Sequence, residues 1–208
     1  MHAGSAVALF LYCEVRGSYR TGVALFTAAG IELMAALPSR QELQPLLAQL
    51  WGRLGACKVM LNNGEDAINA LHQGLRYATT DQETAFALAH LGHAEILYGT
   101  VALGEEKVNE SLALSRRYSD LLGMARAQHV RIWFFPDFTE AIQHCEASLA
   151  LWRKVGRPDR IAEVLSQLAF HMCCRGDYAI AHTYWQESIA VAYRLGMQHC
   201  IAWSLDCL

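Results

Sequence analysis

The chain has 208 residues, of which 53% are hydrophobic and 18% charged, and its formal net charge at pH 7 is −3. This composition is typical of an ordered globular chain and excludes an intrinsically disordered one. No block of basic residues occurs, so we expect no direct nucleic-acid binding by this segment. The first apolar run, residues 6–13, is too short to span a bilayer, so no membrane segment is expected either.

Seven cysteines are scattered along the chain. Their number is odd, no C-x-x-C motif occurs, and Cys173 and Cys174 are adjacent. These features argue against a disulfide scaffold. A free cysteine behaves as a small hydrophobic residue. The cysteines therefore predict a reducing, cytoplasmic location.

The stretch of residues 165–196 has the clearest organisation in the chain. Its hydrophobic residues recur at helical spacing on both sides of a Gly-Asp-Tyr turn at residues 176–178. The residues that recur are Leu165, Leu168 and Ala169 before the turn, and Ala181, Trp185 and Ser188 after it. The stretch predicts two amphipathic helices joined as an antiparallel pair.

Similar units precede this one. A small residue returns at one register position of each second helix, as Gly22, Ala67, Gly104, Ala141 and Ala181. A glycine inside a helix costs about 1 kcal/mol relative to alanine, so its repeated use needs a packing reason. The pattern predicts that the two helices of each pair approach closely at this position.

These motifs resemble the tetratricopeptide repeat (TPR) family, with Trp51, Leu54 and Gly55 similar to its W-x-x-L-G motif and residues 176–178 similar to its turn. The resemblance implies an all-α fold, a right-handed superhelix of stacked antiparallel helix pairs. We predict a single array, with units at residues 3–37, 39–79, 81–118, 120–156, 158–196 and a partial unit at 198–208. Because the last unit stops inside a helix, we expect the chain to be a fragment of a longer protein.

The repeats are longer than is usual for this family. The turns at Gly17, Asn62, Gly99, Pro136 and Gly176 are separated by 45, 37, 37 and 40 residues, against a family period of about 34. Such lengthened repeats look like those of large bacterial signalling and transcription-regulatory proteins. The longest step contains Ser39 and Glu42, which predict a capping box at the start of the next helix. The register of the first helix in the fourth unit stays open.

The resemblance also implies which residues face the concave groove. The polar and aromatic residues expected there are Arg53, His90, His93, Arg126, His129, Trp133, Gln167 and Phe170. Related repeats that clamp a terminal carboxylate carry Lys and Asn at the groove positions, and this chain lacks them. A semi-apolar groove suits a peptide, an amphipathic helix or a partner domain. The alternative is that these residues only pack against neighbouring helices or face water.

No chemistry is apparent in the chain. His90 and His93 share a helix face, but no further ligand at a fitting spacing completes a metal site. Nucleophile, phosphate-loop and zinc-protease motifs are absent from the sequence. We therefore expect no enzyme activity, no metal and no cofactor. Trp133 and Trp203 are expected to pack between repeats and not to act as ligand platforms.

The sequence thus predicts a non-catalytic interaction, scaffolding or sensor segment of a larger bacterial signalling or transcription-regulatory protein. Its partner would be a protein or peptide, or other domains of the parent chain. Two alternatives are a small-molecule sensor and a purely structural spacer. Residues 201–208 carry apolar side chains that we expect to promote self-association.

Overall fold

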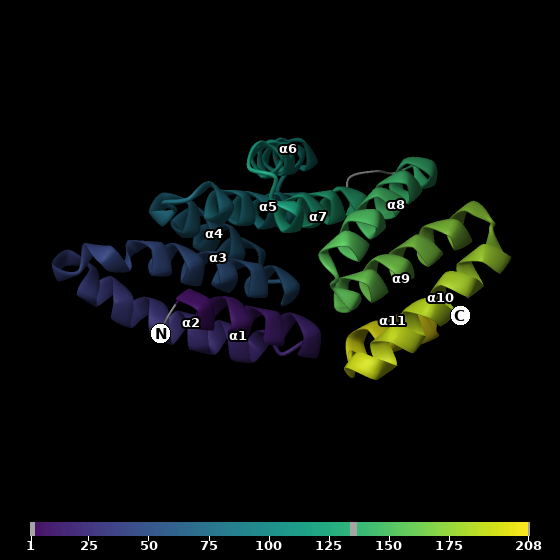
Figure 1. Ribbon diagram of the computed structural model, residues 1–208, viewed down its shortest axis with the longest axis horizontal. Helices are drawn as coiled ribbons and strands as arrows, with labels where there is room; N and C mark the ends of the chain where they lie inside the picture. The colour runs from purple at the N-terminus through teal and green to yellow at the C-terminus, as the bar shows by residue number, and fades with distance from the viewer. Residues whose placement is uncertain (1–2, 134–136, 208) are drawn as a thin grey trace.

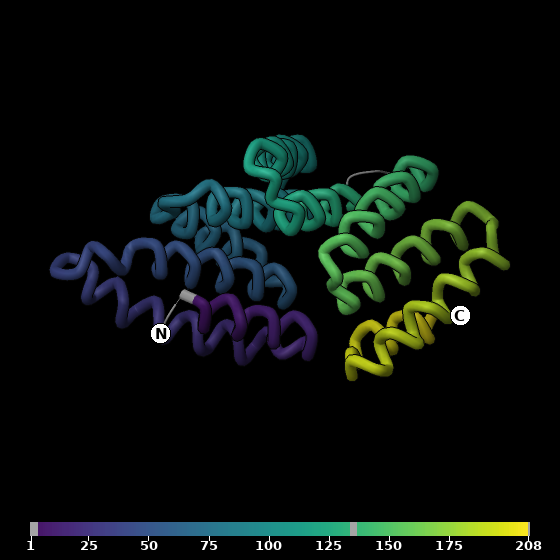
Figure 2. Tube along the Cα trace, viewed as in Figure 1, coloured from purple at the N-terminus to yellow at the C-terminus, as the bar shows by residue number. Residues whose placement is uncertain are grey.

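The computed structural model describes residues 3–133 and 137–207. These residues form eleven α-helices and three short 3₁₀ helices, and they contain no strand. Each helix packs against the next in the sequence (Figures 1 and 2). This confirms the predicted all-α fold of stacked helix pairs.

Five helix pairs follow one another, and a single helix ends the array. The pairs are α1 (Ala3–Arg16) with α2 (Tyr19–Ala36), α3 (Gln44–Met60) with α4 (Gly64–Tyr77), α5 (Asp81–Tyr98) with α6 (Val101–Arg117), α7 (Leu121–Val130) with α8 (Phe138–Val155), and α9 (Pro158–Arg175) with α10 (Tyr178–Leu195). The last helix is α11 (Gln198–Asp206). The 3₁₀ helices are Leu37–Ser39, Gln41–Leu43 and Arg131–Trp133.

The array curves so strongly that its two ends meet. Figure 1 shows the end of α1 beside α11, with the remaining helices arched above them. An ideal Cβ on Gly17 would lie 3.4 Å from His199 Nδ1, and one on Gly196 would lie 3.0 Å from an Arg16 guanidinium nitrogen. The first helix pair and the end of the array therefore enclose the concave side between them.

Glycines set the spacing within the pairs. A Cβ on Gly92 would lie 2.4 Å from Val108 Cγ2 and 2.7 Å from the Gly104 carbonyl oxygen. A Cβ on Gly55 would lie 2.5 Å from Leu71 Cγ. Such distances leave no room for a methyl group. The helices of these pairs approach as closely as the repeated small residues predict.

A hydrogen bond from a serine hydroxyl to a backbone carbonyl joins the two helices in the third and fifth pairs. The Ser111 hydroxyl donates to the Ala85 carbonyl oxygen and the Ser188 hydroxyl to the Ala162 carbonyl oxygen, each over 2.7 Å. The fourth pair is different, because α7 ends after ten residues. In the described part of the chain, the buried hydroxyl of Ser148 in α8 has no hydrogen-bond partner. The unit whose register the sequence leaves open is thus the irregular one.

The predicted capping box at Ser39 is wrong. The Ser39 hydroxyl donates to the Ala36 carbonyl oxygen over 3.1 Å, and Glu42 pairs with Arg40. Helix α3 begins only at Gln44, with Pro45 in its first turn. Proline favours this place because the first amides of a helix have no intrahelical acceptor. The proline therefore determines the start of α3.

The outer surfaces at the two ends of the array expose apolar side chains. The segment Tyr19–Ser39 is long and apolar enough to cross a membrane by composition alone, and only 17% of its most apolar window is buried. In the fold this helix packs against α3. At the other end Ile201 is buried, whereas Trp203 and Leu205 are exposed. Leu208 lies outside the described residues, and self-association through this end stays a prediction.

We predict that Gly92→Ala destabilises the protein, although alanine is the better helix former. The added methyl group would collide with Val108 and the Gly104 backbone, and overpacking of this kind costs about 1–3 kcal/mol. Gly30→Ala in α2 is the matched control, since its Cβ would meet nothing within 4 Å. There we expect a gain of up to about 1 kcal/mol from helix propensity. Urea unfolding of both variants measures the difference, and equal stabilities would contradict the packing argument.

Candidate functional site

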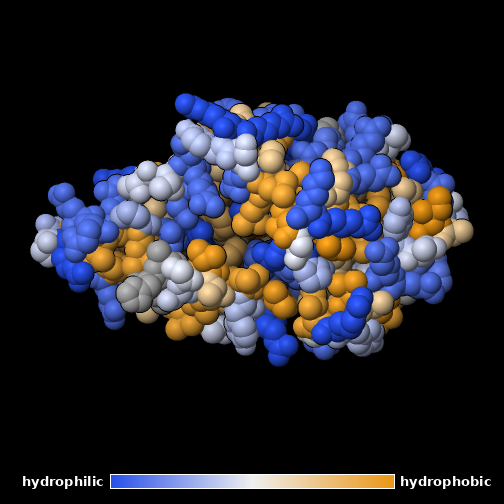
Figure 3. Space-filling model, viewed as in Figure 1, coloured by the Kyte–Doolittle hydropathy of each residue, from blue (hydrophilic) through white to orange (hydrophobic). Residues whose placement is uncertain are grey.

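Three connected pockets follow the concave side. An inner pocket of about 60 Å³ lies between α1, α5, α7 and α8, and an outer chamber of about 310 Å³ adjoins it. Both are lined by Phe10, Glu14 and Arg126. A third, aromatic pocket of about 180 Å³ shares Trp133 with the inner pocket. Figure 3 shows hydrophobic residues gathered around a hollow near the centre of this face.

All eight residues expected at the groove line one of these pockets. His90, His93, Arg126, His129 and Trp133 line the inner pocket, Arg53 and Arg126 the outer chamber, and Trp133, Gln167 and Phe170 the aromatic pocket. Of the two registers open for the fourth unit, one places Arg126 with Val130 in the groove and the other His129 with Trp133. The inner pocket is lined by all four of these residues.

The guanidinium groups of two arginines lie over the Phe86 ring. The guanidinium carbon of Arg53 lies 4.1 Å from the ring centroid and that of Arg126 lies 4.5 Å from it. Arg53 is 6% exposed and forms a two-pronged ion pair with Glu83, with one Nη2–Oε1 distance of 3.2 Å. Arg126 forms no ion pair with any described residue; its guanidinium lies over the Phe86 ring, and Glu14 favours its charged form.

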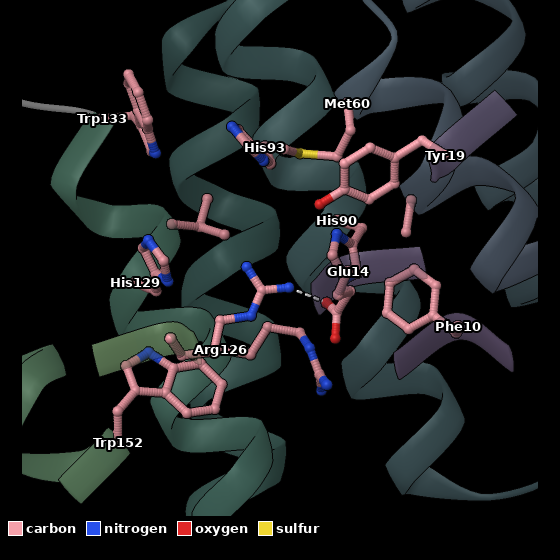
Figure 4. A pocket seen from close by; sticks show the side chains of 13 residues that line it. Phe10, Glu14, Tyr19, Met60, His90, His93, Arg126, His129, Trp133 and Trp152 are labelled. Atoms are coloured by element: carbon pink, nitrogen blue, oxygen red, sulfur yellow. Dashed lines mark hydrogen bonds and ion pairs between the residues drawn. The ribbon is translucent and has the colours of Figure 1, made fainter. Parts of the chain in front are cut away.

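Three histidines, His90, His93 and His129, line the inner pocket (Figure 4). The His93 ring stacks on Trp133 with centroids 6.0 Å apart, and the His90 ring lies 4.6 Å from Phe86. His129 Nε2 lies 3.1 Å from Gln167 Oε1. The histidines therefore hold aromatic and amide neighbours in place around the cavity.

Burial makes these histidines weak bases. It lowers the pKa of His93 to about 4, with a further contribution from His129. Burial likewise lowers the pKa of His129 to about 4, against the opposing influence of Glu163. It also lowers the pKa of His90 well below its ordinary value. All three rings are therefore neutral at pH 7, and the pocket's positive charge comes from its arginines.

Glu14 ties the first helix pair to the fifth. Its carboxylate accepts from Arg157 Nη2 over 3.1 Å and from Arg160. Each arginine also has a local partner, Asp159 for Arg157 and Glu163 for Arg160. Glu14 is 4% exposed, so this junction is buried. It joins residues that are 143 and 146 positions apart in the chain.

Glu163 completes the junction. Burial alone would raise the pKa of its carboxyl group, but Arg160 and then His199 outweigh burial and lower the pKa to about 2. His199 Nε2 lies 3.5 Å from Glu163 Oε1. The α11 helix is thereby connected to the same charge network.

Sequence reasoning missed Glu14, Arg157 and Arg160 as site residues. A signal for Glu14 exists, because it interrupts a long apolar stretch inside a predicted helix. Buried carboxylates are rare unless they are paired. The arginines carry no such signal, since the sequence does not show that the two ends of the array meet.

Trp133 packs between repeats as expected, since it stacks on His93 of the third pair, but neither Trp133 nor Trp203 is buried. They are 40% and 43% exposed, and with Phe170, also 40% exposed, they line the aromatic pocket. Trp133 lies in the 3₁₀ helix Arg131–Trp133 that follows α7, and Trp203 lies in α11. Large exposed aromatic side chains in a concave site are typical of ligand or protein contact surfaces.

In the described part of the chain, no three His, Cys, Asp or Glu side chains come close enough together to hold a metal ion. The described cysteines are all free, and burial raises the pKa of the thiols of Cys57 and Cys145, the latter to about 12. Such thiols are poor nucleophiles. What the site offers is cationic, aromatic and hydrogen-bonding surface.

With this geometry described, comparison with known proteins becomes informative. Residues 137–204 match the model of the tetratricopeptide repeat family. The structure is similar to a signal transduction ATPase with numerous domains from Pyrococcus horikoshii that has a tetratricopeptide repeat sensor, at 16% identity and a TM-score of 0.65. The match covers 90% of this chain and 31% of that one. No curated protein matches the sequence.

Two further solved structures are similar. One is a Rap protein complexed with Competence and Sporulation Factor, at 16% identity and a TM-score of 0.68, covering 94% of this chain and 58% of that one. The other consists of kinesin light chain TPR-like repeats from Podosopora anserina, at 15% identity and a TM-score of 0.54, covering 91% and 94%. The chain is therefore a TPR-like α-solenoid, as its motifs predict. It spans about a third of the signal transduction ATPase and somewhat over half of the Rap protein.

We predict that Glu14→Gln loosens the junction between the ends. Breaking a buried ion pair costs about 3–5 kcal/mol, and because both arginines keep a local carboxylate we expect about 2 kcal/mol here. The matched control is Glu187→Gln, whose pair with Arg153 is solvent-exposed and worth under about 1 kcal/mol. Urea unfolding gives the stabilities, and X-ray scattering should show a larger radius of gyration only for Glu14→Gln. Equal effects of the two variants would show that the junction does not hold the ends.

We also predict that stability falls as the pH drops from about 6.5 towards 4. The unfolded chain takes up protons on histidines that the folded protein keeps neutral, so the unfolded state gains free energy of protonation. Each such histidine contributes up to about 1.4 kcal/mol per pH unit in this range. His129→Gln, which can still bond to Gln167, should lower the slope by one such contribution. Urea unfolding at several pH values tests this, and an unchanged slope would refute it.

Proposed function

We propose that this chain is a non-catalytic interaction segment of a larger, cytoplasmic bacterial signalling or transcription-regulatory protein. Its concave face binds a peptide or an exposed segment of a partner protein, including other domains of the parent chain. The TPR-like fold supports this assignment, since such repeats generally mediate protein–protein interaction. Two similar structures, a protein with a TPR sensor and a Rap protein in complex with a factor, agree with a signalling role.

The observation that carries the proposal is the continuous line of pockets along the first helices. The outer chamber begins at Val7, the inner pocket connects it to Trp133, and the aromatic pocket ends at Trp203. Trp133, Phe170 and Trp203 are exposed within it. A row of pockets with aromatic walls suits an extended or helical segment that places one side chain in each pocket. A structural spacer would not need such a surface.

A small-molecule sensor is the second candidate. It is favoured by the convergence of His93, Arg126 and Trp133 on one enclosed pocket, as expected for a compact ligand site. Against it stands the inner pocket's volume of about 60 Å³, which is far below the several hundred Å³ of ordinary ligand sites. Of the three pockets described on the concave side, the outer chamber of about 310 Å³ has the most room for a small organic molecule.

The proposal is tested by selecting peptides from a displayed random library on the protein and measuring their affinities by calorimetry. We expect the double variant Trp133→Ala, Phe170→Ala to bind the selected peptides at least about tenfold more weakly, because truncating aromatic contact residues typically costs more than 1 kcal/mol each.

The matched control is Tyr193→Ala, which removes an aromatic side chain that is 61% exposed on the second helix α10. Its affinity for the same peptides should equal that of the wild type. If only Tyr193→Ala loses binding, the peptides bind at α10 and not on the concave face, and the proposal is wrong. If no peptide is selected, while a metabolite raises the melting temperature in a thermal-shift screen, the small-molecule alternative is favoured.

A further inference from the structure

A further pocket lies beside the turn that connects the third helix pair to the fourth, and we call it the turn pocket. Its volume of about 440 Å³ is larger than that of each of the three concave pockets. The first turn of α5, the last turn of α6 and the residue before α7 surround it. The polar groups that matter here come from Asp81, Gln82, Ser115, Tyr118 and Asp120.

The turn between α6 and α7 brings two of these groups together. Ser119 has a φ of 55°, and the Asp120 amide donates to the Ser115 carbonyl oxygen over 2.8 Å. The position that a Cβ on Gly123 would occupy lies within 2.7 Å of both Ser115 Oγ and Asp120 Oδ2. The hydroxyl and the carboxylate are therefore close enough for one group placed between them to bond with both.

The Ser115 hydroxyl is buried and unused. Ser115 is 2% exposed, and its hydroxyl has no hydrogen-bond partner in the described part of the chain. Ser111, one turn earlier in α6, differs because its hydroxyl donates to the Ala85 carbonyl oxygen. Native proteins leave few buried polar groups without partners. The free hydroxyl therefore indicates that this pocket receives an atom able to bond with it.

The Asp120 carboxylate is not committed to its own helix. Asp120 stands at the N-cap of α7, yet its side chain accepts no capping hydrogen bond. Asp137, at the N-cap of α8, accepts a hydrogen bond from the Thr139 amide over 2.8 Å. An aspartate at a helix start usually makes such a bond. The carboxylate of Asp120 is thus available to an occupant of the pocket.

Asp81 brings a second carboxylate to the pocket. A hydrogen bond with Asp81 raises the pKa of Tyr118, whose ring is half-exposed. Neither Asp81 nor Asp120 takes part in an ion pair among the residues that the structure describes. Arg117 lies nearby, with its guanidinium carbon 5.4 Å from the Tyr118 ring centroid, but it pairs with neither carboxylate. The negative charge of the pocket is therefore not neutralised by an ion pair within these residues.

These groups define the chemistry of an occupant. Ionised carboxylates only accept hydrogen bonds, a serine hydroxyl can accept one, and the face of a tyrosine ring attracts a cation. An ammonium or guanidinium group carries the matching donors and the opposite charge. The volume of about 440 Å³ lies in the range of ordinary ligand sites and has room for the aliphatic part of a basic side chain.

We propose that the turn pocket binds a lysine or arginine side chain of the partner, with Asp120 as its ion-pair partner and the Ser115 hydroxyl as a hydrogen-bond partner. Asp81 adds negative charge and holds Tyr118 beside the cation. Gln82 and Asp120 also line the outer chamber, so the turn pocket continues the row of concave pockets. The inference rests on the proposed interaction function and names a charge that the partner brings.

Three capped amino acids serve as probes, namely the N-acetyl methylamides of lysine, arginine and norleucine. Norleucine has the aliphatic chain of lysine without the ammonium group. Protein NMR titrations that follow the Gly123 amide compare their affinities. We expect lysine or arginine to bind about tenfold more tightly than norleucine, because charge-assisted hydrogen bonds are the strong ones. Raising the salt concentration from about 20 to about 300 mM should reduce this preference.

Asp120→Asn should remove the preference, and asparagine caps a helix as well as aspartate does, so the variant should keep its fold. Ser115→Ala should weaken the basic probes several-fold without changing norleucine. The matched control is Glu140→Gln, which neutralises an exposed carboxylate in the first turn of α8 and should leave all three affinities unchanged.

Equal affinities of lysine, arginine and norleucine, or a basic preference that survives Asp120→Asn, would overturn the site. A fourth probe, 1,5-diaminopentane, tests the source of the cation. If it binds more tightly than both basic amino acids, the occupant is a free amine and the assignment to a partner side chain is wrong. Peptides selected by display should be enriched in lysine or arginine. Selected peptides that depend on Trp133 and Phe170 but lack this enrichment would refute the turn-pocket site and leave the proposed function standing.

Discussion

The concave site depends on the ion pairs that Glu14 makes with Arg157 and Arg160. In a solenoid each repeat contacts only its neighbours, so the ends of the array are normally independent. Here a buried carboxylate from the first helix pair is shared by two arginines of the fifth. This contact joins the first helix pair to the fifth and so closes the array. The inner pocket is lined from both sides of this closure, by Phe10 and Glu14 of α1 and by Arg160 of α9.

The curvature that brings these ends together originates in short-range packing. Gly92 and Gly104 lie against each other in the third pair, and Gly55 lies against Leu71 in the second. The fourth pair breaks the regular pattern, since α7 is short and Ser148 lacks the hydrogen bond that Ser111 and Ser188 make. This irregular pair also supplies Arg126 to the site. Departures from the local rule are expected where a fold accommodates function.

The sequence predicts the fold because the features that define a repeat lie close together along the chain. Its period, its turn and its small residues can each be read within a single unit of about 40 residues, and neighbouring units confirm one another. The groove residues follow from the same register, which is why Arg53, His93 and Arg126 all line concave pockets. The start of α3 was predicted wrongly because Pro45 outweighs the capping pattern at Ser39.

The rest of the site could not be predicted in this way. Glu14, Tyr19 and Trp152 act at the pocket only because the superhelix closes, and closure is the sum of small rotations that no single repeat displays. The exposure of Trp203 has the same origin, since whether a groove position is covered depends on what lies across the hollow. Long-range geometry is thus the information that a repeat-by-repeat reading lacks.

Closure also links the occupancy of the site to the shape of the array. Tyr19 comes from the first helix pair, and Arg126 and Trp152 come from the fourth. An occupant that contacts residues of both pairs does so only when the array is closed, so its binding free energy favours the closed arrangement over an open one. Conversely, a change that strengthens the Glu14 junction raises the population of the closed arrangement and strengthens binding in the pocket until the array is fully closed. A solenoid closed on itself can therefore couple the binding of a partner in its concave site to the contact between its two ends.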